Sequence, residues 1–261
     1  MNWKKYLRRI LNKFGYDVVR CYGDKRNAVY MPCTPYTYRT FAPWFSAEFQ
    51  VLYSKVSNNT IVKEDRCYII HRLANHCSGL PGNVAECGVF KGGTAFVIAD
   101  ALRQTSKRVR LYDTFSGFPE GTENDPSGHK AGGFGNVSLQ AVKAYLSDFP
   151  SVEYAPGVIP ETFNHTDKET YCFVHVDVDL YRSVYDCCVY FYPRLVAGGV
   201  MIFDDYGFEP YIDAGKKAVD DFFLDKPEVP FSLRTGQCIL IKLPDAQASE
   251  RPDIAMDSKK K

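Results

Sequence analysis

The feature that most constrains the fold is an alternation of strand-like and helical segments that begins at residue 83. Five apolar runs have the pattern of strands: NVAECGV (83–89), RVRLYDT (108–114), SVEYAPG (151–157), YCFVHVDV (171–178) and GGVMIFDD (198–205). Helical patterns start between them near Thr94, Ser138 and Ser183, and Ser138 suits an N-cap position. Repeated β–α units predict an α/β fold, in which helices cover both faces of a parallel sheet.

The segments on either side of this alternation complete the predicted organisation. Residues 62–79 have a helical pattern, and another helix is expected from residue 211 to about 225. PFSLRTG and QCILIK then follow as two strands that are joined tightly enough to be antiparallel. We expect a helical and aromatic cap over residues 1–60, the main domain over 61–245, and a polar, disordered tail over 246–261.

Composition excludes several classes of protein. The 261 residues are 45% hydrophobic and 24% charged, and the net charge of +1 gives no indication of a nucleic-acid partner. The nine cysteines form no C-x-x-C pair and no metal-ligand spacing with histidine, which favours reduced thiols. No run approaches the roughly 18 apolar residues of a membrane span, and the N-terminus lacks an apolar signal core. We therefore expect a cytoplasmic protein.

The first 14 residues have the pattern of a basic amphipathic helix. Apolar side chains from Trp3 to Phe14 fall on one face, and lysines and arginines fill the other. This pattern fits a weak, peripheral contact with the inner membrane surface. Packing on the same domain or on a second copy in a homo-oligomer is the favoured interpretation, because one apolar stripe is the ordinary signature of packing.

The expected strand ends carry most of the polar residues that could do chemistry. In an open α/β sheet, ligands bind outside the carboxyl ends of the strands. These ends supply Glu86, Gly88, Gly92, Gly93 and Thr94, then Asp113, Thr114, Phe115 and Ser116, then Gly157, and finally Asp177, Asp179, Asp204 and Asp205. All of them are predicted to lie along one edge of the sheet.

The first strand end, AECGVFKGGT, is a glycine-rich turn between a strand and a helix. Glycine permits a close approach of a ligand to the backbone. The turn matches neither G-x-G-x-x-G nor a Walker A sequence, so on its own it is a weak signal. Asp113 strengthens it, because an acidic residue that closes the next strand, about 20–30 residues on, is placed to accept hydrogen bonds from ribose hydroxyls.

The fourth and fifth strand ends bring carboxylates together. Asp177 and Asp179 in HVDVDLY alternate with valine and leucine, and Asp204 and Asp205 follow the run VMIF. Two adjacent carboxylates repel each other unless a cation lies nearby. Oxygen ligands without thiolate or imidazole partners suit Mg²⁺ or Ca²⁺ rather than zinc. The sequence therefore predicts a divalent-cation site at these two strand ends.

Five stretches in this order, AECGVFKGGT, LYDTFSGFP, HVDVDLYRSV, YPRLVAGGV and FDDYG, resemble the macrocin-type O-methyltransferases over roughly residues 60–243. The resemblance implies a class I methyltransferase fold: a doubly wound, Rossmann-like sheet of seven strands, mostly parallel with one antiparallel strand. It implies S-adenosylmethionine and Mg²⁺ as cofactors and Asp177, Asp204 and Asp205 as metal ligands, with Asp177 also the catalytic base. It places Glu86, Gly88, Gly93, Thr94, Asp113 and Ser116 in the S-adenosylmethionine site, which the edge residues Gly92, Thr114, Phe115 and Gly157 are expected to join.

The expected function is O-methylation of a sugar hydroxyl in a glycosylated natural product or a surface glycan. A cation that binds two vicinal hydroxyls lowers the pKa of one of them, and a carboxylate can then take its proton. His175 is expected to have a structural role or to act as a base, and His129 could contact the acceptor. The glycine-rich segment 121–137 is long enough for a lid.

Three alternatives stay open. A catechol or phenolic O-methyltransferase could use the aromatic residues of segment 36–49 to hold a flat acceptor. A nicotinamide-dependent oxidoreductase could use the same glycine turn, but it gives no reason for the aspartates to converge. A non-catalytic binding module on the same scaffold is the third alternative.

Overall fold

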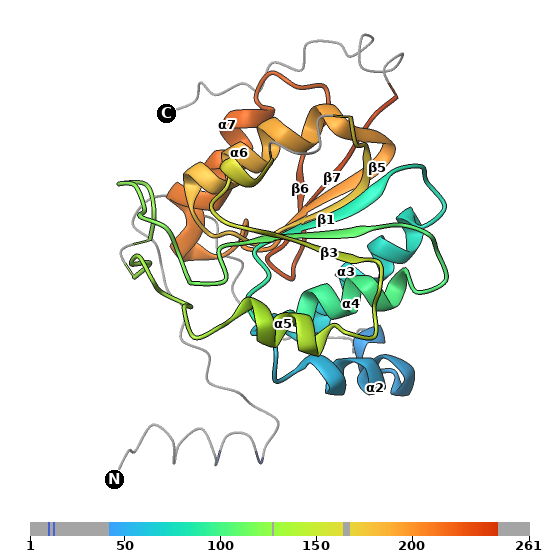
Figure 1. The fold of residues 1–261 in the computed structure, drawn as a ribbon. Coiled ribbons are helices and arrows are strands. Elements are labelled where there is room, and N and C mark those ends of the chain that lie inside the picture. Colours follow the sequence, from blue (N-terminus) through green and yellow to red (C-terminus); the bar gives the residue numbers. More distant parts are fainter. Residues whose placement is uncertain (1–9, 11–12, 14–41, 127, 164–167, 245–261) are drawn as a thin grey trace. The chain divides into compact units, whose positions relative to one another are not determined.

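The computed structural model of the chain describes residues 10, 13, 42–126, 128–163 and 168–244 (Figure 1). The predicted amphipathic helix 1–14 lies outside the described residues except at Ile10 and Lys13, and the predicted tail 246–261 lies wholly outside them. The chain separates into two compact units, residues 1–42 and 43–261, and the second contains the sheet.

The second unit is built on a seven-stranded sheet with the order β3-β2-β1-β4-β5-β7-β6 (Figure 1). Its strands are β1 (Asn83–Cys87), β2 (Val109–Asp113), β3 (Val152–Pro156), β4 (Tyr171–Val176), β5 (Leu195–Phe203), β6 (Phe231–Ser232) and β7 (Cys238–Ile241). The first five strands are parallel, and β7 pairs antiparallel with both β5 and β6. The predicted seven-stranded, mostly parallel sheet with one antiparallel strand is confirmed.

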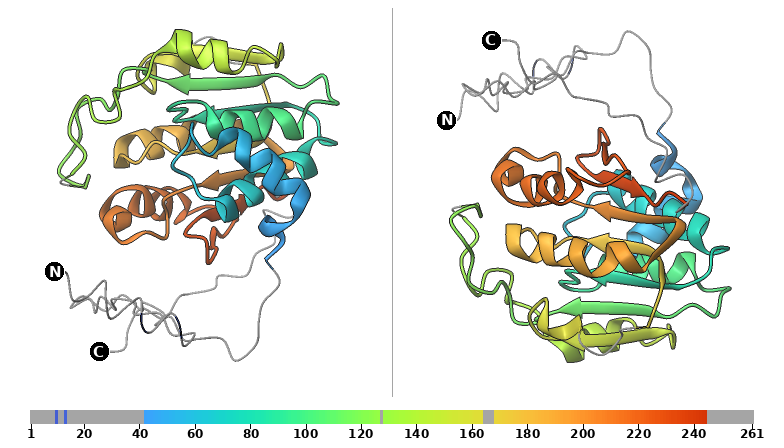
Figure 2. Two further views of the ribbon diagram at one scale, coloured as in Figure 1. Left: turned by 90° about the horizontal axis from the view of Figure 1, so that it is seen from below. Right: turned by 90° about the horizontal axis from the view of Figure 1, so that it is seen from above.

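Helices cover both faces of the sheet (Figures 1 and 2). Helices α2 (Ala47–Val56), α3 (Glu64–Cys77), α4 (Gly93–Ala101) and α5 (Leu139–Tyr145) lie on one face, and α6 (Tyr181–Phe191) and α7 (Lys217–Phe223) lie on the other. Two separate apolar clusters result because successive strand side chains point to opposite faces. In β1, for example, Val84 packs in the first cluster and Ala85 in the second.

Several connections contain short helical turns. These are η1 (Pro43–Phe45), η2 (Glu161–Phe163), η3 (Tyr192–Arg194), η4 (Glu209–Tyr211) and the π-helical turn η5 (Ile212–Lys216). The turns η4 and η5 together with α7 occupy the region where one continuous helix was predicted from residue 211. Ser138 is the N-cap of α5, as predicted, and its hydroxyl accepts from the Ala141 amide at 3.2 Å. Helix α6 begins at Tyr181, two residues before the predicted start.

The parallel strands end earlier than their apolar runs suggest, which places the polar residues just beyond the sheet. Strands β1, β4 and β5 end at Cys87, Val176 and Phe203. Their ends stay aligned because the Asp177 amide donates to the Cys87 carbonyl at 2.8 Å, and the Asp204 amide donates to the Val176 carbonyl at 3.0 Å. The sheet thereby positions both aspartates at one edge.

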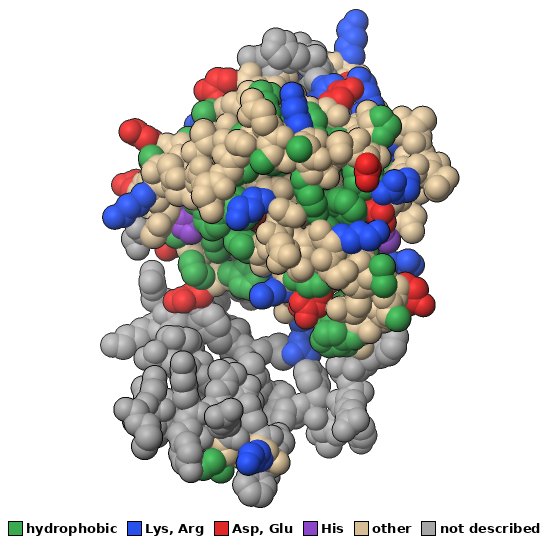
Figure 3. All heavy atoms as spheres, turned by 60° about the horizontal axis from the view of Figure 1, so that its bottom comes forward, with side chains coloured by type: hydrophobic (Ala, Val, Ile, Leu, Met, Phe, Trp, Pro, Cys, Tyr) green, Lys and Arg blue, Asp and Glu red, His purple; other side chains and the backbone are tan. Residues whose placement is uncertain are grey.

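Two properties concern contacts with a membrane and with charged partners: the character of the helices and the distribution of surface charge. Within the described residues, no helix combines the length and apolar character that crossing a bilayer requires. Acidic and basic side chains are interspersed over the described part of the face in Figure 3.

Candidate active site

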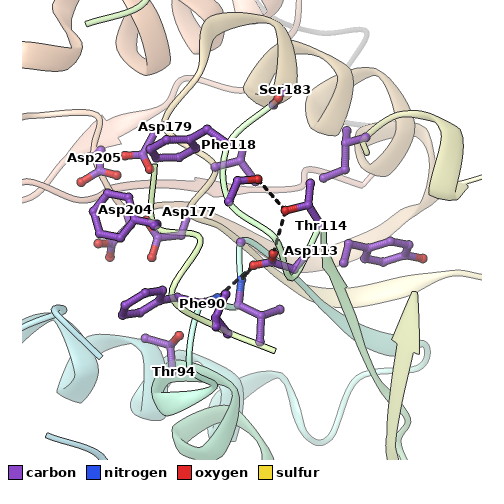
Figure 4. A pocket seen from close by; sticks show the side chains of 18 of the residues that line it. Phe90, Thr94, Asp113, Thr114, Phe118, Asp177, Asp179, Ser183, Asp204 and Asp205 are labelled. Atoms are coloured by element: carbon purple, nitrogen blue, oxygen red, sulfur yellow. Dashed lines mark hydrogen bonds between the residues drawn. The ribbon is translucent and has the colours of Figure 1, made fainter. Parts of the chain in front are cut away.

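A pocket lies at the carboxyl ends of the parallel strands (Figure 4). It is lined by the residues that follow β1, β2, β3, β4 and β5, and by residues from the segments 60–66 and 117–137. Its empty volume, including the open mouth, is about 1030 Å³.

The glycine turn after β1 forms one wall of the pocket. Gly88 has φ +86°, and a Cβ atom there would lie 1.8 Å from the carbonyl oxygen of Asp177. A side chain at this position would collide with the backbone that follows β4, so only glycine allows β1 and β4 to lie this close. The glycine therefore lets the turn after β1 pack directly against the backbone after β4 at the pocket.

Asp113, at the end of β2, holds this turn in place. Its Oδ2 accepts from the amides of Val89 at 2.6 Å and Phe90 at 2.9 Å, and its Oδ1 accepts from the Phe115 amide at 2.7 Å (Figure 4). A carboxylate has about four lone-pair positions. The Thr114 hydroxyl lies 3.5 Å from Oδ1, but its single proton goes to the Gly117 carbonyl at 2.6 Å, so the three amide bonds leave about one position free. Asp113 lines the pocket and could accept a ligand hydroxyl at that position.

On the other side of the pocket, Asp177, Asp179 and Asp205 gather (Figure 4). Oxygen atoms of these three residues all lie within 4.8 Å of one another. Burial and the neighbouring carboxylates of Asp204 and Asp205 raise the pKa of Asp177 well above its usual value. Burial and Asp205 do the same to the pKa of Asp179, and burial and Asp204 raise that of Asp205. A cation placed among them would relieve this repulsion.

Asp204 lies in a different environment from its neighbour Asp205. Its carboxylate is almost fully buried, and its Oδ2 forms an ion pair with the Arg66 guanidinium. Its Oδ1 accepts from the Gln237 amide at 2.8 Å and lies 3.6 Å from Nε2 of His175. Burial acts to raise the pKa of Asp204, but the contacts with His175 and Arg66 outweigh it and lower that pKa.

Glu86 and His175 form a buried pair beneath the edge of the sheet. Both side chains are 0% exposed, and Nδ1 of His175 lies 2.8 Å from Oε1 of Glu86. Burial acts to lower the pKa of His175, yet its contacts with Asp204 and Glu86 raise it to about 9. Glu86 in β1, His175 in β4 and Asp204 after β5 thus lie next to one another, with a hydrogen bond between the first two and a 3.6 Å approach between the last two.

The segment 117–137, which contains the glycine-rich stretch 121–137, lines part of the pocket. Phe118 and Phe134 of this segment pack edge-on at 5.3 Å, and Phe134 packs against Phe90 of the glycine turn at 5.4 Å. Farther along, Oδ1 of Asp125 accepts from the Tyr181 amide at 2.6 Å, at the start of α6. The segment is therefore held at both sides of the pocket and adds an aromatic wall to it.

His129 of the same segment lies near the carboxylates. Its Nε2 is 3.2 Å from the Tyr211 hydroxyl and 3.8 Å from Oδ1 of Asp179. Burial lowers the pKa of His129. Asp179 itself has φ +61°, a conformation that is uncommon for residues other than glycine, and such strain is concentrated at functional sites.

The structure places the predicted site residues in two groups. The first lines the pocket: Gly88, Thr94, Asp113, Thr114, Gly157, Asp177, Asp204 and Asp205. The second lies outside the lining and comprises Glu86, Gly92, Gly93, Phe115 and Ser116. Glu86 is beneath the pocket, Phe115 is buried in the first apolar cluster, and Ser116 is exposed.

Gly92 and Gly93 have packing roles at the start of α4. Gly92 has φ +86° and lies against Val142 and Tyr145 of α5. The Gly93 amide donates to the Asn59 carbonyl at 3.0 Å, and a Cβ there would lie 2.7 Å from Thr60. Both glycines therefore connect α4 with neighbouring segments.

Sequence reasoning missed three of the residues that shape the pocket: Arg66, Phe118 and Tyr211. Arg66 comes from α3, before the β–α alternation begins, and nothing in its local pattern distinguishes it from a surface arginine. Asp179 was considered with the aspartates but was not assigned as a ligand. The available signal was its spacing of two residues from Asp177.

The fold and the pocket identify the structural class of the protein. A mostly parallel seven-stranded sheet with a glycine turn after β1 and an acidic residue at the end of β2 is the class I O-methyltransferase fold. The solved O-methyltransferase NovP shares it with a TM-score of 0.63 at 24% identity, over 71% of this chain and 83% of that chain.

Comparison of the sequence with those of known proteins shows the family to which the chain belongs. A family model described as "Macrocin-O-methyltransferase (TylF)" matches residues 55–228, and the chain is a member of that family. The 8-demethyl-8-(2,3-dimethoxy-α-L-rhamnosyl)-tetracenomycin-C 4'-O-methyltransferase of Streptomyces olivaceus is 31% identical over 55% of this chain and 59% of its own length. The mycinamicin III 3''-O-methyltransferase of Micromonospora griseorubida is 30% identical over 58% of this chain and 67% of its own length.

Proposed function

We propose that this protein transfers the methyl group of S-adenosylmethionine to a sugar hydroxyl of a glycosylated small molecule, assisted by a divalent cation. The observation that carries the proposal is that one pocket contains both the glycine turn with Asp113 and the cluster of Asp177, Asp179 and Asp205. A donor site and a hydroxyl-activating site within one pocket are what an in-line methyl transfer requires.

The donor is assigned to the side of the pocket formed by β1 and β2. Gly88 lines the pocket there, and Asp113 retains about one acceptor position for a ribose hydroxyl. Thr94, at the start of α4, lines the same side. S-adenosylmethionine supplies a methyl group on a sulfonium, and this side would hold it facing the aspartates.

The cation is assigned to the aspartates. Their carboxylate oxygens are the hard ligands that Mg²⁺ prefers, and burial and mutual repulsion raise the pKa of each of the three. The residues present therefore fit a divalent cation. Asp177 and Asp205 are proposed as ligands, with Asp179 or the predicted Asp204 as a third. When bound, the cation lowers the pKa of the acceptor hydroxyl and orients it.

Asp177 is proposed as the catalytic base. It lies at the centre of the strand ends, where the backbone after β4 meets the glycine turn. Asp177 takes the hydroxyl proton as the new C–O bond forms and the C–S bond of the donor breaks, which leaves S-adenosylhomocysteine. General bases placed in this way contribute about 10²–10⁴-fold to the rate.

The acceptor is assigned to the space between the aspartates and the aromatic wall of Phe90, Phe118 and Phe134. One relative is named as a 4'-O-methyltransferase of a rhamnosyl-bearing tetracenomycin, which supports a sugar acceptor. The aromatic wall also fits a flat ring, so a catechol is the second candidate.

A comparison of acceptors tests the proposal. We expect purified protein with Mg²⁺ and methyl-labelled S-adenosylmethionine to methylate deoxyhexosyl conjugates that carry vicinal hydroxyls. A matched conjugate without the neighbouring hydroxyl should react at least about tenfold more slowly, because it offers the cation one ligand instead of two. Faster labelling of simple catechols would favour the second candidate, and no labelling of any hydroxyl would reject the activity.

We propose three further properties. The seven described cysteines Cys67, Cys77, Cys87, Cys172, Cys187, Cys188 and Cys238 are all free and buried, which supports a reducing, cytoplasmic setting. Contact of segment 1–14 with a membrane surface and association into a homo-oligomer stay predictions.

A further inference from the structure

Arg66 is the only basic side chain among the described residues that line the pocket. It lies near the start of α3, and its guanidinium reaches the aspartates at the ends of β4 and β5. Nη1 forms the ion pair with Oδ2 of Asp204 and lies 3.7 Å from Oδ1 of Asp205. The carboxylate of Asp177 also acts electrostatically on it. The guanidinium thus lies within the field of the carboxylates that are assigned to the cation.

The position of Arg66 is held from two sides. Its side chain is 12% exposed, and its Cζ lies 5.0 Å from the centre of the Phe208 ring. Its partner Asp204 also accepts a hydrogen bond from the Gln237 amide at its other carboxylate oxygen. An arginine held by a buried carboxylate and an aromatic face stays close to the cluster.

We propose that Arg66 is a built-in counter-cation of the carboxylate cluster, which competes with the divalent metal ion and so sets how weakly the protein binds that ion. This inference rests on the proposed cation site. A guanidinium and a divalent ion that share Asp205 repel each other, and the ion pair with Arg66 occupies one oxygen of Asp204. Arg66 therefore acts as a positioning residue and does not take part in the chemistry.

The proposed role of Arg66 affects how the metal site is filled. The Arg66 guanidinium partly neutralises the negative charge of the carboxylates. The fold therefore does not depend on the metal ion. The protein alone binds the ion weakly, and the vicinal hydroxyls of the acceptor add the ligands that make binding tight. Metal and acceptor are thereby expected to bind cooperatively.

Direct binding of Mn²⁺, measured by electron paramagnetic resonance of the free ion, tests this inference without any turnover. We expect Arg66→Gln to bind Mn²⁺ about tenfold or more tightly than the unsubstituted protein, because a positive charge beside the ion is removed. Arg66→Lys keeps the charge and should bind about as weakly as the unsubstituted protein. Arg72→Gln, at an exposed position on the same helix, is the matched control.

The outcomes separate the two proposals. Equal or weaker Mn²⁺ binding by Arg66→Gln overturns the role of Arg66 and leaves the cation site standing. No binding by any variant at millimolar Mn²⁺ overturns the cation site itself, and the Arg66 inference with it. If Arg66→Gln does not fold, the comparison of Asp204→Asn with Asp204→Asn/Arg66→Gln replaces it, because the double variant leaves no unpaired carboxylate at position 204. Tighter binding by the double variant is then the expected result, and equal binding overturns the inference.

Discussion

Replacing Asp177 by Asn is expected to lower kcat by about 10²–10⁴-fold, because the substitution removes the base proposed to take the hydroxyl proton. Asparagine has nearly the same shape and keeps the backbone bond between the Asp177 amide and the Cys87 carbonyl. The loss should therefore appear in turnover, while binding of S-adenosylhomocysteine stays within about twofold. Single-turnover methyl transfer, monitored with labelled donor, measures the chemical step directly.

Asp148→Asn changes an exposed aspartate that does not line the pocket; it is the control and should retain full activity. A turnover rate for Asp177→Asn within a factor of about three of the unsubstituted rate would remove Asp177 from the chemistry. If the rate falls only because the donor no longer binds, the role of Asp177 is in the donor site and not in proton transfer.

Replacing His175 by Gln is expected to destabilise the fold by about 3–5 kcal/mol, because breaking a buried charged pair leaves one partner uncompensated. The imidazole contacts Glu86 at 2.8 Å, and both side chains are fully buried. Urea unfolding, followed by tryptophan fluorescence, gives the free energy of unfolding of each variant.

The double variant Glu86→Gln/His175→Gln shows whether the stability lost in His175→Gln comes from the unpaired charge or from the changed side-chain shape. It removes both members of the pair, so most of the stability lost in His175→Gln should return. If the double variant is at least as unstable as the sum of the two single variants, packing and not charge explains the role of His175. The same series reports whether Glu86 is structural, as its place outside the pocket lining indicates.

The β–α alternation was readable from sequence because each parallel strand is a short apolar run followed by a polar or glycine residue. The order of these runs placed Gly88, Asp113, Asp177 and Asp204 at the carboxyl ends of strands, where the structure has them. The predicted positions of the strand ends were less accurate. The run to Val178 continues past the end of β4, because apolar character does not report where ladder pairing stops.

The division of labour among the aspartates could not be read from sequence. Asp204 and Asp205 are neighbours in the chain, yet Asp204 turns towards Arg66, Gln237 and His175 while Asp205 joins Asp177 and Asp179. Arg66 lies 138 residues from its partner, and a contact this distant leaves no local pattern. Asp113 is similar: its position suggested a ribose contact, but its three bonds to backbone amides depend on how the glycine turn folds.

The central claim is that the pocket takes the methyl donor, and calorimetric titration of S-adenosylhomocysteine tests it most directly. We expect S-adenosylhomocysteine to bind with micromolar affinity, with Mg²⁺ or with EDTA, because the donor is assigned to Asp113 and the glycine turn and not to the carboxylates of Asp177, Asp179 and Asp205 (Figure 4). NAD(H) should not bind under the same conditions. Binding of NAD(H) together with no binding of S-adenosylhomocysteine would contradict the methyltransferase account and favour an oxidoreductase on this sheet.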